Sequence, residues 1–152
     1  MNTLTFNAGD IIFRQGDFPN TMYNIVKGKV GVYTDYETDD FKELAQLGTD
    51  EFLGEMGMIE IYPRSATAVA LEDGTELEEI SEEELNEYFR DKPEKLLKMM
   101  RQISSRLRET NKKYLNACRA VFENAEAEAN GTEKSEWLKE EIGIICKEYE
   151  NM

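Results

Sequence analysis

The segment from about Glu94 to Glu128 contains neither proline nor glycine, and it limits the possible folds of this chain more than any other feature. Its apolar side chains recur every seven residues, at Met100, Leu107, Tyr114 and Val121, with Ile103, Cys118 and Ala125 in neighbouring positions. A heptad spacing of this kind predicts one long helix with a narrow apolar seam. At the rise of an α-helix, it would be roughly 50 Å long.

This seam can be covered in two ways. It can pack on the chain's own β domain, or it can pair with the same helix of a second copy. Because so long a helix would extend past a small domain, we expect a homodimer. Lys92-Pro93 marks the start of the helix and Asn130-Gly131 marks its end. A last helix, from about Ser135 to Glu150, carries Leu138, Ile142, Ile145 and Tyr149 on one face.

The first 80 residues predict short strands separated by glycine turns. In YNIVKGKVGVY, residues 23–33, apolar residues alternate with polar or small ones around Lys27-Gly28, which predicts a hairpin. Residues 67–80 predict two more strands around Asp73-Gly74. Many short strands with frequent turns indicate a barrel, a roll or a sandwich.

A short helix should follow these strands. Ser81 and Glu84 have the spacing of a capping box, which predicts a helix that buries Leu85, Tyr88 and Phe89.

The composition excludes several kinds of site. The 152 residues include no histidine, which removes imidazole acid–base catalysis and most zinc and haem sites. Two cysteines, Cys118 and Cys146, are too few for an iron–sulfur cluster or a disulfide framework. The formal net charge of −14 disfavours nonspecific binding to DNA or to an anionic membrane. No apolar run approaches membrane-spanning length, so we expect a cytoplasmic protein with reduced thiols. Because histidine is absent, we expect no metal site.

One arginine stands out in the stretch FLGEMGMIEIYPRSATA, residues 52–68. Gly54 allows close approach of the backbone or a positive φ, and EMGM can form one helical turn whose first amides suit a phosphate. Arg64 presents a fork of donors that matches two phosphate oxygens, whereas ionised Glu55 only accepts hydrogen bonds and suits hydroxyls. Alternatively, Glu55 and Arg64 form a structural ion pair under a turn.

These residues carry a resemblance. Gly54-Glu55 and Pro63-Arg64-Ser65-Ala66-Thr67 resemble, at the same spacing, the phosphate-binding cassette of the cyclic nucleotide-binding domain family. Other signatures of that family occur in order around it, at Ile12–Asp17, Met22–Tyr33 and Asp50–Phe52. The resemblance covers roughly residues 4–115.

The resemblance implies an α+β fold. In it an antiparallel β-roll, a jelly-roll-like double-stranded β-helix, is followed by a long dimerising helix and a short C-terminal helix. We place the nucleotide-binding roll with its short helix at residues 1–91, the long helix at 92–129 and the C-terminal helix at 130–152.

The resemblance also implies roles for individual residues. Glu55 would hold the ribose 2′-hydroxyl and Arg64 the cyclic phosphate. Amides near Met56 and Gly57, and around Ser65 and Ala66, would complete the phosphate site. The helix also resembles the dimerising helix of catabolite activator proteins, and Thr110-Asn111 stands where a Thr-Ser pair contacts adenine, one residue from each subunit. The expected ligand is cAMP, and cGMP is the alternative, since Ser65 does not distinguish adenine from guanine.

The expected function is therefore that of a homodimeric cyclic nucleotide sensor, and not that of an enzyme. The transcription regulators of the family carry a winged helix-turn-helix after the long helix, but only about 25 residues follow Glu128 here, and this segment is acidic overall. We expect no direct DNA binding, and signalling through the C-terminal helices to a protein partner. The alternative is a ligand-free dimeric scaffold with a vestigial pocket.

Overall fold

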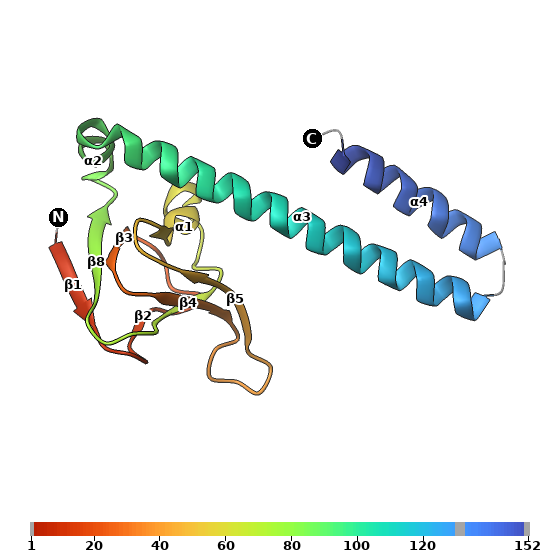
Figure 1. Ribbon diagram of the computed structural model, residues 1–152, viewed down its shortest axis with the longest axis horizontal. Coiled ribbons are helices and arrows are strands. Elements are labelled where there is room, and N and C mark those ends of the chain that lie inside the picture. The colour runs from red at the N-terminus through yellow and green to blue at the C-terminus, as the bar shows by residue number, and fades with distance from the viewer. Residues whose placement is uncertain (1, 130–132, 151–152) are drawn as a thin grey trace. The chain divides into compact units, whose positions relative to one another are not determined.

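Short strands separated by glycine turns build two four-stranded antiparallel sheets in the computed structural model, which describes residues 2–129 and 133–150 (Figure 1). One sheet has the order β1 (Asn2–Phe6), β8 (Thr75–Ser81), β3 (Thr21–Lys27) and β6 (Phe52–Leu53). The other has the order β2 (Ile11–Phe13), β7 (Thr67–Ala70), β4 (Val30–Thr34) and β5 (Lys42–Leu47). The predicted antiparallel roll is thus confirmed.

The core lies between these two sheets. Successive side chains of a strand point to opposite faces of its sheet, so each sheet turns one face toward the core. Ile25 and Leu77 pair across β3 and β8, and Val30 and Leu47 pair across β4 and β5. All four side chains are buried in one apolar cluster, so strands from both sheets share a single core.

The predicted hairpin at residues 23–33 is wrong. β3 and β4 are both present, but β3 pairs with β6 and β8, whereas β4 pairs with β5 and β7. Gly28 between them has φ +89, and a Cβ there would lie 2.9 Å from the Cα of Thr75. Gly28 therefore lies at a corner where the chain passes from one sheet to the other. A corner and a hairpin share the same local pattern, because the sequence of a turn does not say which strand will pair with which.

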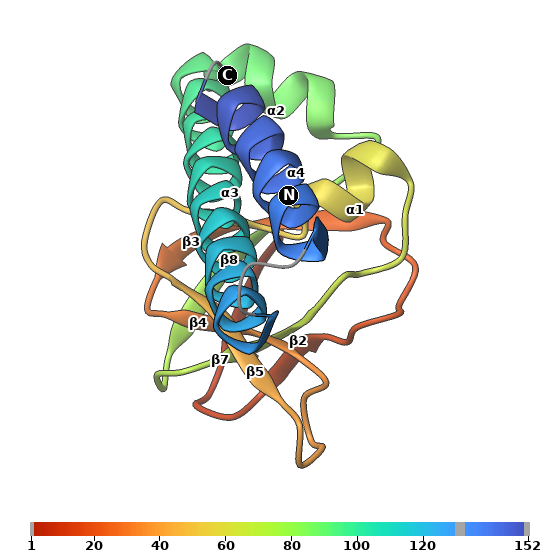
Figure 2. The ribbon, with the colours of Figure 1, turned by 90° about the vertical axis from the view of Figure 1, so that its right-hand side faces the viewer.

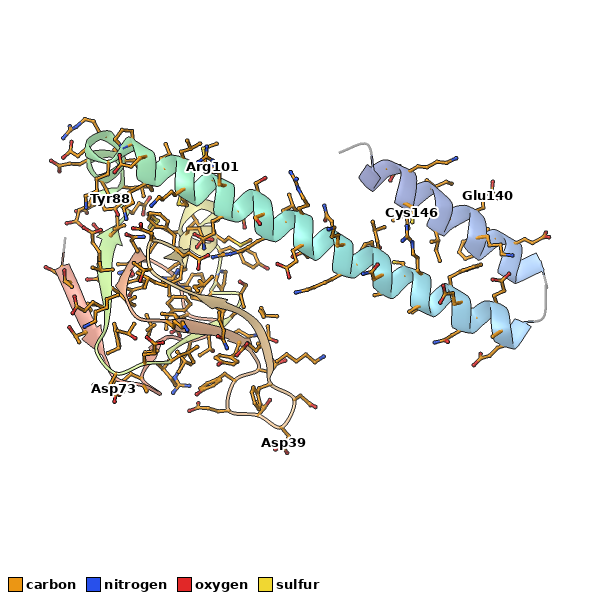
Figure 3. All side chains as sticks on the ribbon, in the orientation of Figure 1. Asp39, Asp73, Tyr88, Arg101, Glu140 and Cys146 are labelled. Atoms are coloured by element: carbon orange, nitrogen blue, oxygen red, sulfur yellow. The ribbon has the colours of Figure 1, made fainter. Side chains whose placement is uncertain are left out.

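Two short helices accompany the roll. α1 (Glu55–Glu60) follows β6, and α2 (Leu85–Asp91) follows β8. The Ser81 N–H donates to Glu84 Oε2 at 3.1 Å, which is one of the two contacts of the predicted capping box. The helix itself begins later than predicted, because Glu84 and not Ser81 is the N-cap of α2. Tyr88 on α2 is buried and donates its hydroxyl to Glu78 Oε2 on β8 at 2.9 Å (Figure 3). Burial and this carboxylate raise the pKa of Tyr88.

The long helix α3 (Pro93–Ala129) confirms the prediction from the proline- and glycine-free segment. It crosses the boundary between two compact units of the chain, Met1–Gln102 and Ile103–Met152, and each unit is described by itself. The predicted end of the helix at Asn130-Gly131 lies outside the described residues. Among the described residues, no helix has both the length and the apolar content that crossing a bilayer requires.

The second unit contains the rest of α3 and the helix α4 (Glu133–Glu150), which confirms the predicted C-terminal helix (Figures 1 and 2). Lys139 on α4 forms an ion pair with Glu126 on α3 and lies over the ring of Phe122. Arg119 on α3 donates to the sulfur of Cys146 on α4 at 3.8 Å. Of the predicted apolar face, Ile142 and Ile145 are half-buried. The side chains of the other two members, Leu138 and Tyr149, lie outside the described residues.

Candidate functional site

A glycine corner connects β6 to α1. Gly54 has φ +79, a conformation that L-residues with a Cβ rarely adopt. A Cβ at this position would lie 3.0 Å from Cζ of Arg64, so the site has no room for a side chain. The carbonyl of Gly54 accepts the first bond of α1, from the Met58 N–H at 3.4 Å. The chain therefore needs glycine here both for its backbone angle and for the space that Arg64 occupies.

Glu55 is the first residue of α1, and its side chain is only 1% exposed. A carboxylate is rarely buried to this extent, because removal from water is unfavourable unless polar groups compensate. When ionised it offers only acceptor oxygens. Burial next to a glycine corner therefore positions a hydrogen-bond acceptor inside the first unit.

Arg64 is almost as deeply buried, at 5% exposure, and it is anchored by neutral groups. Its Nη1 donates to the carbonyl of Gly54 and its Nη2 donates to the carbonyl of Thr21, both at 2.6 Å. The guanidinium carbon lies 4.2 Å from the centre of the Phe13 ring, in a cation–π contact. These three contacts hold the guanidinium in one place.

Burial lowers the pKa of Arg64, and the charges of Tyr23, Glu55 and Asp17 act in the opposite direction. Arginine stays protonated in proteins, so the guanidinium remains a buried cation.

The N-terminal segment holds the main chain of Arg64 as well. The Gly16 N–H donates to the Arg64 carbonyl and the Arg64 N–H donates to the Asp17 carbonyl, each at 2.8 Å. Beside them, the Gln15 N–H donates to Thr67 Oγ1 at 3.0 Å. The Gly-Asp motif at residues 16–17 is thus part of the site's framework.

Sequence reasoning placed Gly16-Asp17 at a turn, and it assigned no role in the site to that pair, to Phe13 or to Thr21. A signal was present for Phe13 and for Gly16-Asp17, since all three belong to one of the family signatures around the cassette. Thr21 had no such signal, because it holds Arg64 through its main-chain carbonyl, a group that every residue carries.

The structure brings most of the predicted site residues together in the first unit. Gly54, Glu55, Met56 and Gly57 lie at the start of α1, and Arg64, Ser65 and Ala66 lie just before β7. The side chains of Met56 and Ser65 are exposed, whereas Gly57 and Ala66 are buried. A Cβ on Gly57 would lie 2.9 Å from the carbonyl oxygen of Tyr62, so the backbone of residue 62 leaves no room for a side chain here either.

The other two predicted residues belong to the second unit. Thr110 and Asn111 lie on α3, with Thr110 exposed and Asn111 half-buried.

This arrangement suits a ligand that is both an anion and a hydroxyl donor. A guanidinium offers five N–H groups, and two of those of Arg64 go to carbonyl oxygens within the described unit. An anion attracts the guanidinium more strongly than a neutral carbonyl does, because both partners of that hydrogen bond are then charged. A buried carboxylate close by can accept from a hydroxyl.

Comparison with known proteins identifies the family of this chain. The family described as "Cyclic nucleotide-binding domain" matches residues 3–92. The Cyclic AMP receptor protein of Thermus thermophilus is 35% identical over 106 residues, which are 70% of this chain and 49% of that protein. The chain spans about half the length of the curated relatives that it matches.

Solved structures agree on the fold. The catabolite activator protein of Thermus thermophilus superposes with a TM-score of 0.68 at 24% identity, covering 99% of this chain and 78% of that one. The c-di-GMP responsive global regulator CLP of Xanthomonas campestris gives a TM-score of 0.64 at 29% identity, covering 74% of this chain and 57% of that one. With its roll, its cassette and these matches, the chain belongs to the cyclic nucleotide-binding domain family.

Proposed function

We propose that this chain is a sensor that binds a cyclic nucleotide, namely cAMP, at the corner formed by Gly54 to Gly57 and Arg64 to Ala66. The observation that carries the proposal is the buried guanidinium of Arg64, anchored to neutral carbonyl groups beside the buried carboxylate of Glu55. A buried cation gains more from an anionic ligand than an exposed one does, because water screens the pair less.

The cyclic phosphate would accept from Arg64, and the main-chain amides near Met56, Gly57, Ser65 and Ala66 would complete its coordination. Glu55 would accept a hydrogen bond from the ribose 2′-hydroxyl. Thr110 and Asn111 would contact the base, one from each subunit of a dimer. The name of the Thermus relative supports cAMP as the first choice, with cGMP as the second. Because the related regulator CLP is c-di-GMP responsive, c-di-GMP is a necessary third member of any ligand panel.

The sensor would signal through a change in the position of its C-terminal helices. Nucleotide occupancy would bias the position of α3 and α4, and a protein partner would read that position. The bias can be no larger than the ligand's differential affinity for the two positions. We propose no catalysis, and the net charge of −14 argues against DNA as a direct partner of these 152 residues. If no ligand binds, the fold would serve as a dimeric interaction scaffold.

Calorimetry and thermal unfolding with cAMP, cGMP and c-di-GMP test the proposal. A ligand at 100 times its dissociation constant should raise the free energy of unfolding by about 2.7 kcal/mol. Adenosine lacks the phosphate, and in 5′-AMP the phosphate is not closed onto the ribose 3′-oxygen. Both should therefore bind much more weakly than cAMP. An unchanged unfolding temperature with all three cyclic ligands would contradict the sensor function and favour the interaction scaffold.

Arg64→Ala should weaken cAMP binding by at least about tenfold, because a hydrogen bond to a charged group contributes roughly 1.5–3 kcal/mol. Arg101→Ala is the matched control, since Arg101 is an exposed arginine on α3 (Figure 3). The dissociation constant should be measured well below the unfolding temperature, because Arg64 also bonds two carbonyls of the fold. Equal affinity in a folded Arg64→Ala protein would contradict the proposed role.

Glu55→Gln combined with 2′-deoxy-cAMP tests the second contact. Removing either the carboxylate or the 2′-hydroxyl should weaken binding, and removing both should weaken it little further, because the two changes delete one interaction. Calorimetry on the four combinations gives the coupling energy. Strictly additive losses would show that Glu55 does not meet the 2′-hydroxyl.

A further inference from the structure

The side chain of Gln102 makes two hydrogen bonds to the main chain of a single residue, Phe52. The Phe52 N–H donates to Gln102 Oε1 and Gln102 Nε2 donates to the Phe52 carbonyl, both at 2.8 Å. A primary amide has one donor face and one acceptor face, so it can pair with a strand as a neighbouring strand would. Gln102 lies on α3, at the end of the first unit.

Phe52 needs such a partner because β6 is the edge strand of its sheet. The preceding carbonyl, that of Glu51, accepts from the Ile25 N–H of β3 at 2.9 Å. Main-chain groups of successive residues in a strand point to opposite edges, so those of Phe52 point away from β3. Phe52 is 0% exposed. Main-chain groups in such a place are almost always paired, and Gln102 pairs both.

The position of Phe52 also sets the start of the candidate site. Two residues later, the Gly54 carbonyl accepts from Arg64, and Glu55 begins α1. A shift of β6 at its free edge would therefore move the acceptor that holds Arg64.

Two lysines on the same face of α3 contact Asp50, two residues before Phe52, and one of them also contacts Asn24 on β3. Lys95 donates to Asn24 Oδ1 at 2.9 Å and pairs with Asp50, and Lys98 donates to Asp50 Oδ2 at 2.7 Å. Positions 95, 98 and 102 follow helical spacing, so one stripe of α3 reaches all of these partners. Asp50 is half-exposed, and exposed ion pairs are weak. The amide of Gln102 is thus the strongest candidate for holding β6.

We infer that Gln102 is a positioning residue for the nucleotide site, because it fixes the edge of β6 and with it the Gly54–Glu55 corner. The inference rests on the proposed nucleotide binding. The two hydrogen bonds of Gln102 connect α3 to β6, the strand that leads into the cassette, so their free energy and that of nucleotide binding are linked. By that linkage, a nucleotide that orders the corner strengthens the contact with Gln102, and loss of the contact weakens nucleotide binding by the same factor.

The test compares Gln102→Met with Gln46→Met in the full chain. Methionine keeps the length of the side chain without a hydrogen-bonding amide, and Gln46 is an exposed glutamine on β5 whose amide meets only Glu43 among the contacts described. Amide hydrogen exchange at Phe52, followed by NMR without ligand, should be at least about tenfold faster in Gln102→Met, because a buried donor loses its acceptor. It should not change in Gln46→Met.

The dissociation constant for cAMP, measured well below the unfolding temperature, separates positioning from fold stability. Positioning predicts about tenfold weaker binding in Gln102→Met. A purely structural role predicts an unchanged constant in the folded protein, and that result would overturn the inference. If Gln102→Met does not fold, Gln102→Glu takes its place, since it keeps an acceptor for the Phe52 N–H but has no donor for the carbonyl. The same direction of change in the constant is expected.

The two experiments also distinguish failure of this inference from failure of the proposed function. If the wild type binds no cyclic nucleotide, exchange at Phe52 still decides whether Gln102 holds β6. Faster exchange in Gln102→Met then supports the hold, and unchanged exchange overturns it.

Discussion

At the scale of the residue, Gly54 shows why this corner admits one amino acid. Gly54→Ala meets two penalties, a positive φ and a Cβ placed against the guanidinium of Arg64. Gly74→Ala is the matched control, because Gly74 has φ +72 but nothing within 4 Å of its added Cβ. The control should lose about 1–2 kcal/mol of stability from the backbone alone. Gly54→Ala should lose at least about 1 kcal/mol more, since a buried side chain must shift.

Urea unfolding of the three proteins measures both losses, and calorimetry with cAMP should show weaker binding for Gly54→Ala only. Equal losses at the two glycines would mean that Arg64 can move aside without penalty.

At the scale of the element, Asp50 joins the roll to the first turns of α3. Hydrogen bonds from Lys95 and then Lys98 lower the pKa of Asp50 from 3.8 to about 2. A carboxyl with a lower pKa in the folded state adds stability above its unfolded pKa, and this is lost as the pH falls through the folded value. Asp50→Asn should therefore lower the free energy of unfolding at pH 7, by less than about 1 kcal/mol because the pair is half-exposed.

The difference between wild type and Asp50→Asn should shrink between about pH 4 and pH 2, the window between the two pKa values. Asparagine suits the comparison because residue 50 has φ +70, which asparagine tolerates. Urea unfolding at a series of pH values measures the difference. A constant gap across the whole range would show that the effect does not come from the charge.

At the scale of the whole molecule, we expect the apolar seam of α3 to pair with the same helix of a second copy. Met100, Leu107, Tyr114 and Val121 are between 48% and 66% exposed, although they recur at heptad spacing. Leu107→Glu should therefore weaken a homodimer by more than about a hundredfold, because each dimer loses two buried leucines at roughly 1.5–3 kcal/mol each.

Lys112→Glu, a charge change at an exposed position of the same helix, should leave the dimer intact. Sedimentation equilibrium or native mass spectrometry at micromolar concentration gives the masses. A wild-type monomer under these conditions would mean that the seam is not a dimer interface.

Local sequence patterns were enough to predict α3, α4 and the presence of β3, β4, β7 and β8. A heptad repeat, an alternation of apolar residues or a glycine turn acts on neighbouring residues, so it can be recognised without knowing the rest of the chain. The sequence also singled out Gly54, Glu55 and Arg64 by residue type, and the structure places them together in the first unit. Their contacts with a phosphate and a hydroxyl stay a prediction.

The partners of these residues required the tertiary structure. Nothing near Lys27-Gly28 distinguished a hairpin from a corner between sheets, and nothing in the sequence indicated that the Thr21 carbonyl would hold Arg64. Phe13 belongs to a family signature, but that signature did not show that its ring would contact Arg64. In the sequence Gln102 is one polar residue within the segment predicted as a long helix, and only the edge position of β6 makes it a partner of Phe52. Residue types and helical periods are local properties, whereas strand pairing and side-chain anchoring depend on contacts between residues far apart in the chain, whose free energies are realised only when the whole roll has formed.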